Sequence, residues 1–322
     1  MTTVLDRPAP AIGNRGTHPR TEPVLSVHGL EKRYGEHPAL CGVDLEVGRG
    51  EIFAFLGPNG AGKTTTVEIL EGYRSRDGGE VDVLGCDPRS PTRAWRSRIG
   101  VVLQTCAVQP ELTVEELLRL YGGYYPKPLT VDETLDLVGL CDERDRRAGA
   151  LSGGQQRRLD VGLALVGDPE LLFLDEPTTG FDPSARHHTW EVIAGLRDLG
   201  KTVFLTTHYM DEAQALADRV AVIAAGRIVA EGTTDELGGR DREASTVSFV
   251  LPAALSVTDL PELPGVVPQL GDAGRVELHT GVPTSVLATL TGWASERGLE
   301  LAELEVHRPT LEEIYLRLTE QS

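Results

Sequence analysis

Short apolar runs and helical periodicity alternate along most of the chain. Apolar runs typical of strands buried in a parallel sheet occur at Ile52–Leu56, Leu171–Leu174 and Val203–Thr206. Val43–Val47 alternates apolar and polar residues, which predicts a strand with one buried face. A further strand is expected to open at 24–27 and to continue over 30–34. Other strands are expected at 80–84, 99–103, 220–224 and 227–230, the last two forming a hairpin that turns at Ala225-Gly226.

Helical spacing fills several of the intervals between these strands. Thr64–Leu70 has the apolar spacing of a helix start and follows a glycine-rich loop. Thr113 to about Leu140 is helical in pattern, and Pro126 and Pro128 divide it into two pieces. Another helix is expected to begin at Ser152. Strands that alternate with helices in this way predict an α/β fold with a mainly parallel sheet.

The composition changes near Gly238-Gly239-Arg240. Beyond this break, strands are predicted at 246–251, 275–279 and 303–307, and helices at 284–297 and 310–318. The chain therefore divides into a tail over 1–23, a main domain over 24–240 and a small α+β domain over 241–322. The tail has no apolar core stretch, so it is expected to be disordered rather than to act as a signal peptide.

The charge of the chain limits its partners. The formal net charge is −18, and 13 acidic residues against 5 basic ones lie in 241–322. Nucleic-acid-binding proteins usually present a basic face, so nucleic acid is not an expected partner. No run of about 18 apolar residues occurs, so direct membrane insertion is not expected either. These features predict a cytoplasmic protein.

The cysteines do not indicate a metal or redox site. Cys41, Cys86, Cys106 and Cys141 are isolated, without C-x-x-C spacing or a histidine at ligand distance. We expect free thiols in a reducing compartment.

One segment predicts a site for a nucleoside triphosphate. It has the pattern G-x-x-x-x-G-K-T, in which glycines let backbone N–H groups converge on phosphates at a helix N-terminus. Lys63 would neutralise the outer phosphates, and the Thr64 hydroxyl suits Mg²⁺, which prefers oxygen ligands. The expected phosphate-binding residues are Gly57, Pro58, Asn59, Gly60, Ala61, Gly62, Lys63 and Thr64.

Two adjacent carboxylates follow the apolar strand at Leu171–Leu174. Consecutive residues at a strand end point in different directions, so one carboxylate can face a metal while the other faces the γ-phosphate. We expect Asp175 to orient the Mg²⁺ shell through water. Glu176 is the expected general base that polarises the attacking water.

The segment Ser152-Gly153-Gly154-Gln155 supports two interpretations. S-x-x-Q is a capping box, and Leu159, Leu163 and Val166 continue a helical pattern, so the segment can simply start a helix. A helix N-terminus preceded by glycines is also an anion site, at which the Ser152 hydroxyl can donate to a phosphate oxygen.

Together, these motifs resemble those of the ATP-binding subunit of an ABC transporter. The resemblance implies a P-loop NTPase with an ABC-type mixed sheet and a helical subdomain at about 105–165. It also implies a homodimer with two composite sites, in which Ser152–Gln155 binds the ATP held by the other subunit. Thr179–Asp182 resembles the loop that crosses this interface, although Phe181 replaces a more usual Leu.

Four further site residues rest on the same resemblance. Tyr34 is similar to the aromatic residue that stacks on adenine, and Thr65 to a residue that contacts the inner phosphates. Gln104 corresponds to a residue that meets Mg²⁺ and the attacking water and couples the site to the transporter. His208 corresponds to a histidine that contacts the γ-phosphate.

Two late segments narrow the resemblance to the daunorubicin-resistance type of drug exporter. They are His208–Ala213 and Arg308–Tyr315, supported by Asp218-Arg219-Val220 and Gly226–Val229. The implied protein is an ATPase that uses ATP and Mg²⁺ and drives a separately encoded permease from the inner face of the membrane. The alternatives are an import ATPase and a soluble ABC ATPase that acts on ribosomes or DNA. A dead-site interaction protein is disfavoured because Lys63, Asp175, Glu176 and His208 are all present.

Overall fold

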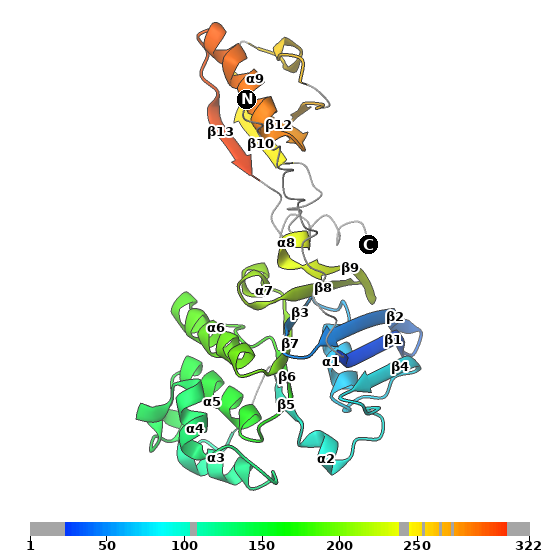
Figure 1. The fold of residues 1–322 in the computed structure, drawn as a ribbon, viewed down its shortest axis with the longest axis vertical. Helices are drawn as coiled ribbons and strands as arrows, with labels where there is room; N and C mark the ends of the chain where they lie inside the picture. Colours follow the sequence, from blue (N-terminus) through cyan, green and yellow to red (C-terminus); the bar gives the residue numbers. More distant parts are fainter. Residues whose placement is uncertain are drawn as a thin grey trace, which may run out of the picture.

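The computed structural model describes residues 23–103, 108–237, 245–252, 255–263, 266–271 and 274–307. Within them the ribbon forms a larger unit up to residue 237 and a smaller one from residue 245 (Figure 1). Each unit has its own sheets and its own buried core.

A six-stranded sheet forms the centre of the larger unit, with strand order β5-β6-β7-β3-β8-β9. The five strands from β5 to β8 pair in parallel, and β9 closes the sheet as an antiparallel hairpin with β8. Its strands are β3 (Ile52–Leu56), β5 (Ile99–Val102), β6 (Leu171–Asp175), β7 (Thr202–Thr207), β8 (Arg219–Ala224) and β9 (Arg227–Thr233).

The apolar runs of these strands are buried on both faces, as the sequence predicts. Phe53 and Phe55 face one core together with Phe204, and these rings pack against one another. Leu172 and Leu174 face the opposite core. The alternation follows from the two-residue period of a strand, and it explains why no polar face is visible in the sequence.

An antiparallel sheet and one helix cover the first face. The sheet has the order β2-β1-β4, with β1 at Pro23–Tyr34, β2 at His37–Gly48 and β4 at Gly78–Val83. Helix α1 (Lys63–Leu70) contributes its apolar residues to the same core. The short helix α2 (Arg93–Arg96) follows β4 and buries Trp95.

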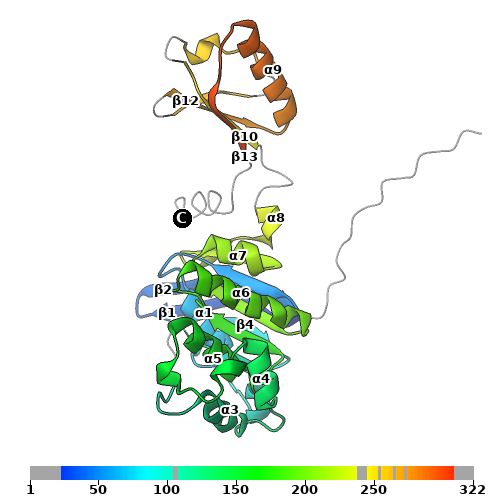
Figure 2. The same cartoon turned by 90° about the vertical axis from the view of Figure 1, so that its left-hand side faces the viewer.

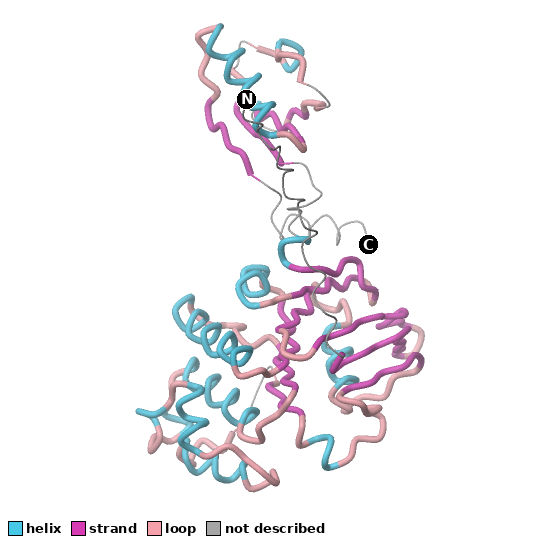
Figure 3. The backbone as a smooth tube through the Cα atoms, in the orientation of Figure 1, coloured by secondary structure: helices cyan, strands magenta, loops and turns pink. Residues whose placement is uncertain are grey.

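Helices cover the second face of the central sheet (Figure 3). Helices α3, α4 and α5 gather at one end of the unit, and α6 runs alongside the sheet (Figure 2). Their bounds are α3 (Val114–Gly122), α4 (Val131–Val138), α5 (Gly153–Leu165) and α6 (Pro183–Asp198). The remaining pieces are α7 (Met210–Leu216), α8 (Thr234–Leu237) and 3₁₀ turns at Cys141–Glu143 and Ala148–Ala150.

The smaller unit is a four-stranded antiparallel sheet with the order β11-β12-β10-β13. Helix α9 (Pro283–Glu296) buries Val286 and Leu290 in a core that includes Val247 and Phe249. The strands are β10 (Ser245–Val250), β11 (Gln269–Leu270), β12 (Arg275–Thr280) and β13 (Ala302–His307), with a 3₁₀ turn at Val257–Asp259.

The structure confirms the predicted α/β core and adds elements that the sequence pattern did not indicate. The additions are α2, α6, α7, α8 and β11. Residues 1–22 of the expected tail over 1–23 lie outside the described residues, whereas Pro23 already belongs to β1. Gln104, Cys106 and the expected helix at 310–318 also lie outside the described residues. Among the residues described, Cys41, Cys86 and Cys141 carry free thiols, and no helix is long and apolar enough to cross a bilayer.

Candidate functional site

The carboxyl ends of three neighbouring strands bring the candidate residues to one edge of the central sheet. Gly57 follows β3, Glu176 follows β6 and His208 follows β7. β7 pairs in parallel with both β3 and β6, so all three strands end at the same edge. Ligand sites of open α/β sheets form at this edge.

The phosphate-loop candidate depends on glycine for steric reasons. A Cβ at Gly57 would lie 2.5 Å from the Ile223 carbonyl oxygen, and one at Gly62 would lie 2.7 Å from a Leu40 methyl. Gly62 also has φ of 111°, which L-residues avoid, and it forms the N-cap of α1. The loop can therefore keep its tight path only with glycine at these positions.

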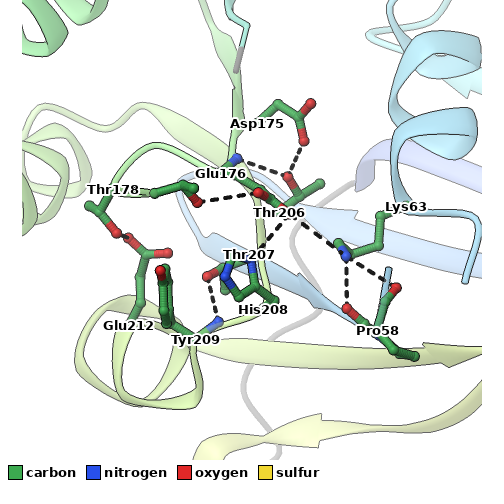
Figure 4. Close-up of polar contacts among 12 residues, drawn as sticks. Pro58, Lys63, Asp175, Glu176, Thr178, Thr206, Thr207, His208, Tyr209 and Glu212 are labelled. Carbon is green, nitrogen blue, oxygen red and sulfur yellow. Dashed lines mark hydrogen bonds and ion pairs between the residues drawn. The ribbon is translucent and has the colours of Figure 1, made fainter. Parts of the chain in front are cut away.

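Lys63 is buried, with 6% of its side chain exposed, and its ammonium faces the loop that precedes it. Its Nζ donates to the carbonyls of Gly57 at 2.7 Å and Pro58 at 3.3 Å and lies 3.8 Å from Glu176 Oε1 (Figure 4). Burial lowers the pKa of Lys63, while Glu176 and Asp175 oppose this shift. The ammonium is thus held by weak acceptors that an anionic ligand can replace.

A threonine on the neighbouring strand orders the two carboxylates. The main-chain N–H of Glu176 lies 3.1 Å from both the carbonyl and the hydroxyl oxygen of Thr206, and the Thr206 hydroxyl donates to Asp175 Oδ1 (Figure 4). Glu176 has φ of 45°, a left-handed conformation. The two carboxylates accordingly have different neighbours: Asp175 Oδ1 contacts Thr206, and Glu176 Oε1 lies near Lys63 and His208.

His208 lies beside the carboxylate of Glu176. Its Nδ1 is 3.2 Å from Glu176 Oε1, an ion-pair distance without hydrogen-bond geometry. The two side chains come from different strand ends and point toward one another in Figure 4. Only 12% of the Glu176 side chain is exposed, so this carboxylate is largely shielded from bulk water, whereas the His208 side chain is 35% exposed.

A buried carboxylate ties together the segments that carry Glu176 and His208. Glu212 Oε1 accepts hydrogen bonds from Thr178 Oγ1 at 2.7 Å and Trp190 Nε1 at 3.1 Å. Burial raises the pKa of Glu212, and bonds from Thr207 and Thr178 counter that shift. Sequence reasoning did not identify Glu212, Thr178 or Thr206, because their role rests on contacts between distant segments.

A cavity of about 590 Å³ joins most of the sequence-predicted residues. Its wall contains Tyr34, Asn59, Gly60, Gly62, Lys63, Thr64, Thr65, Glu176 and His208, together with His37, Ala39 and Thr179. Pro58 contacts the Lys63 ammonium from the loop, and Ala61 is buried behind it. Tyr34 is 42% exposed at this wall, and its hydroxyl lies 3.4 Å from Thr65 Oγ1.

The segment Ser152–Gln155 is not part of that cavity wall in the described chain. It starts α5, on the opposite side of the central sheet from α1 (Figure 1). The predicted capping box is present: Ser152 Oγ accepts from the Gln155 N–H at 3.3 Å, and Gln155 Oε1 accepts from the Ser152 N–H at 2.9 Å. The Ser152 hydroxyl proton remains available to a ligand.

The glycines of this segment have little steric justification within the described subunit. A Cβ added at Gly153 would meet no described atom within 4 Å, and one at Gly154 would meet only the Ala185 methyl at 3.3 Å. Glycine in a helix costs about 0.5–1 kcal/mol relative to alanine. Gly153 therefore leaves the helix surface without a side chain at this position, and this lowers the stability of the helix.

A second cavity, of about 450 Å³, lies between α1, β5 and the helices α3 and α5. Tyr73, Tyr121, Tyr125, Arg96 and Asp160 contribute to its wall. Glu71 also lines it, and its buried Oε1 has no hydrogen-bond partner among the described residues. Burial, reinforced by the charges of Asp175 and Glu68, raises the pKa of Glu71 to about 8.

Two family models match the chain. A model described as ABC transporter matches residues 40–179. A model described as ABC transporter domain-containing protein-like, C-terminal domain, matches residues 245–310. The matches fall in the larger and the smaller unit, respectively.

Curated relatives match along nearly the whole chain. The daunorubicin resistance ATP-binding protein DrrA3 of Streptomyces coeruleorubidus is 41% identical over 306 residues, which cover 92% of this chain and 95% of that protein. The Nod factor export ATP-binding protein I of Ralstonia nicotianae is 38% identical over 325 residues, which cover 97% and 96%.

Solved structures match the larger unit. The ADP conformation of MJ1267, an ATP-binding cassette of an ABC transporter, has a TM-score of 0.61 at 30% identity and covers 67% of this chain and 93% of its own. A dimeric post-hydrolysis state of the cassette MJ0796 with ADP and Pi has a TM-score of 0.58 at 25% identity, covering 65% and 98%. The motifs, the fold and these relatives together show that the chain belongs to the family of ABC transporter ATP-binding subunits and is an ATPase.

Proposed function

We propose that this subunit is the motor of an ABC exporter, an efflux ATPase for a drug or antibiotic, that dimerises around two shared ATP sites and drives a separate permease. The observation that carries the proposal is the cluster of Lys63, Glu176 and His208 in one cavity wall. Export is favoured over import because the relatives cited above are named for drug resistance and Nod factor export. A site on ribosomes or DNA is disfavoured by the net charge of −18.

The residues of the cavity suit hydrolysis of a nucleoside triphosphate. The phosphates would take the place of the Gly57 and Pro58 carbonyls as partners of the Lys63 ammonium, which neutralises their charge. Glu176 would accept a proton from the attacking water. His208, beside Glu176 Oε1, would fix that carboxylate and contact the γ-phosphate. Tyr34 would stack on the base, and Thr65 would contact the inner phosphates.

The residues present also fit Mg²⁺. The described residues contain no group of three or more acidic, histidine or cysteine side chains able to cage a metal. Mg²⁺ needs no such cage, because it binds one or two protein oxygens together with phosphates and water. Thr64 would supply one such oxygen and Asp175 would orient the shell of the ion through water, with Gln104 as a further candidate ligand. The ion would add positive charge where the phosphates carry negative charge.

The signature segment, Ser152–Gln155, supports a site shared between two subunits. It offers a serine hydroxyl proton, helix N–H groups and a bare Gly153 surface, yet it lies outside its own subunit's cavity wall. An anion bound there would have to be presented by another molecule. ATP held by the partner subunit satisfies this requirement and places both subunits around each nucleotide.

The second cavity is a candidate contact for the permease on the cytoplasmic side of the membrane. Its wall includes Glu71–Tyr73, which directly follow α1, together with residues of α3 and α5, and α1 itself starts at the phosphate loop. Movement of these helices against the sheet would reshape it. The exposed tyrosines Tyr73 and Tyr124 near its rim suit a protein partner, since tyrosine is enriched at interfaces.

The direct test replaces the proposed base. Glu176→Gln keeps the size and polarity of the side chain but cannot accept the proton, so turnover should fall by about 10²–10⁴-fold. ATP should still bind and remain intact, which should trap a dimer on gel filtration with ATP and Mg²⁺. Glu191→Gln, at an exposed position on α6, is the matched control. Near-normal turnover by Glu176→Gln would reject Glu176 as the base.

A further inference from the structure

Arg157 is a buried cation that the phosphate site does not use. It lies in α5, two residues after the signature segment, and is 6% exposed. Its guanidinium donates to the main-chain carbonyls of Pro177 at 3.0 Å, Asp175 at 2.9 Å and Leu103 at 2.5 Å. The Asp160 carboxylate lies 3.7 Å away on the same helix.

These carbonyls flank the residues that are proposed to act on ATP. Asp175 and Pro177 enclose Glu176, whose own carbonyl lies 3.5 Å from the same guanidinium. Leu103 follows β5 and directly precedes Gln104. β5 and β6 are paired in register, with Val102 opposite Leu174, so one side chain spans the ends of two neighbouring strands.

The energetics of a buried guanidinium make this link stiff. Its charge is tolerated in the interior only while carbonyl oxygens and a carboxylate surround it. A shift of α5 away from the strand ends would leave a buried cation and several carbonyls unpaired, which is strongly unfavourable. Helix α5 and the main chain around Glu176 should therefore move together.

We propose that Arg157 is the positioning residue that couples the two ATP sites of the dimer. The coupling rests on the proposed function, in which Ser152–Gln155 binds the partner's ATP. A nucleotide bound at Ser152–Gln155 fixes the position of the start of α5. Through Arg157, that position fixes the carbonyls on both sides of Glu176 and the carbonyl that precedes Gln104. Nucleotide binding at the signature segment in one ATP site thereby sets the positions of the catalytic residues in the other ATP site.

The test compares Arg157 with its neighbour on the same helix. Arg157→Lys keeps a charge but loses the planar fork that reaches several carbonyls at once, and Arg157→Met removes the charge. Arg158 is the matched control, because its Nη1 donates to the Gly139 carbonyl at 2.7 Å, at the C-terminal cap of α4. Arg158→Lys and Arg158→Met apply the same changes outside the site.

Five quantities are measured on the full-length chain: affinity for a fluorescent ATP analogue with Mg²⁺ chelated, kcat and KM for ATP, the Hill coefficient and the melting temperature. Both Arg157 variants should bind the analogue within about twofold of wild type, because the phosphate loop is unchanged. Their kcat should fall by about 10- to 100-fold, as expected for a small misplacement of catalytic groups. Their Hill coefficient should fall toward 1, while both Arg158 variants keep wild-type values.

Two results would overturn the coupling role. One is a wild-type kcat and Hill coefficient in Arg157→Lys. The other is a parallel loss of affinity, kcat and melting temperature, which marks a purely structural residue. If Arg157→Met does not fold, Arg157→Lys decides. A wild-type chain without ATPase activity or cooperativity would instead reject the proposed function, and the coupling with it, before any variant is compared.

Discussion

Glu176 and His208 meet at 3.2 Å, between Oε1 and Nδ1, although they lie on different strand ends and 32 positions apart in the chain. Parallel pairing of β6 with β7 makes this possible, because it places Asp175 opposite Thr206 and leaves both following loops at one edge. The same Glu176 oxygen lies 3.8 Å from Lys63 Nζ. The three groups therefore gather around one carboxylate oxygen, and we expect a change in one to alter the position of the others.

Removing the His208 side chain should lower the rate of ATP hydrolysis without preventing ATP binding. His208→Ala should lower kcat by about 100-fold, because Glu176 loses the side chain that fixes its carboxylate. ATP affinity should change by less than about threefold, since the phosphate loop is retained. His28→Ala, on the exposed surface of β1, is the control. A wild-type kcat in the His208→Ala variant would show that His208 takes no part in ATP hydrolysis.

Mixing two defective subunits should restore activity if each site is shared. Lys63→Ala damages one subunit's phosphate loop, and Ser152→Arg damages the other subunit's signature segment. In a mixed dimer both lesions fall in one site and the second site stays complete. ATPase activity should appear in the mixture that neither variant has alone. Proven mixed dimers without any recovery would count against the shared arrangement.

The protonation of Glu71 should make stability depend on pH in a defined direction. The pKa of this carboxyl is about 8 in the folded protein and 4.5 in its ordinary state. Between those values the unfolded chain binds fewer protons than the folded one, so the contribution of Glu71 to stability falls as pH rises. Glu71→Gln has no such loss.

The difference in stability between Glu71→Gln and wild type should therefore grow from pH 5 to pH 8, by on the order of 2 kcal/mol. Denaturant unfolding at a series of pH values measures it. The difference between the two proteins removes the effect of the other titrating groups. Exposed Glu191→Gln should show a constant difference. A constant difference for Glu71→Gln would mean that Glu71 is charged in the folded protein.

The smaller unit, which starts at residue 245, should support assembly of the subunits rather than nucleotide binding. Its buried residues form a core of their own, with no member from the ATP-binding unit. Truncation after Leu237 should leave affinity for ATP unchanged but weaken dimerisation or transport. Equilibrium binding on the truncated chain, together with gel filtration, checks both. Loss of ATP affinity in the isolated, folded truncation would place this unit in the site.

The central sheet and the phosphate loop could be predicted because their signals are local. The apolar runs at Ile52–Leu56 and Leu171–Leu174 mark strands by themselves, and the glycine spacing before Lys63 marks the loop. Helix α6 was not predicted, because its exposed face is rich in charge and histidine. The spacing of Trp190, Ile193 and Leu196, all packed against one core, was the available signal.

The supports of the site could not be predicted in the same way. Thr206 ends an apolar run and resembles any buried strand threonine, yet its hydroxyl donates to the Asp175 carboxylate and accepts from the main-chain N–H of Glu176. Arg157-Arg158 has the sequence of a solvated helix face, although Arg157 is buried against carbonyls and Arg158 contacts a surface loop. Only the fold distinguishes the two arginines, because their partners are far away in the chain.

The left-handed backbone at Glu176 lowers the stability of the fold, whereas the carboxylate of the same residue is required for the proposed chemistry. A side chain other than glycine, asparagine or aspartate pays of order 1 kcal/mol for a φ of 45°. Selection for stability alone would favour asparagine or glycine at this position, and either would remove the carboxylate. Random mutagenesis screened only for heat resistance should therefore drift toward inactive proteins at position 176. Stabilised versions of this motor are better sought at sites away from the strand edge.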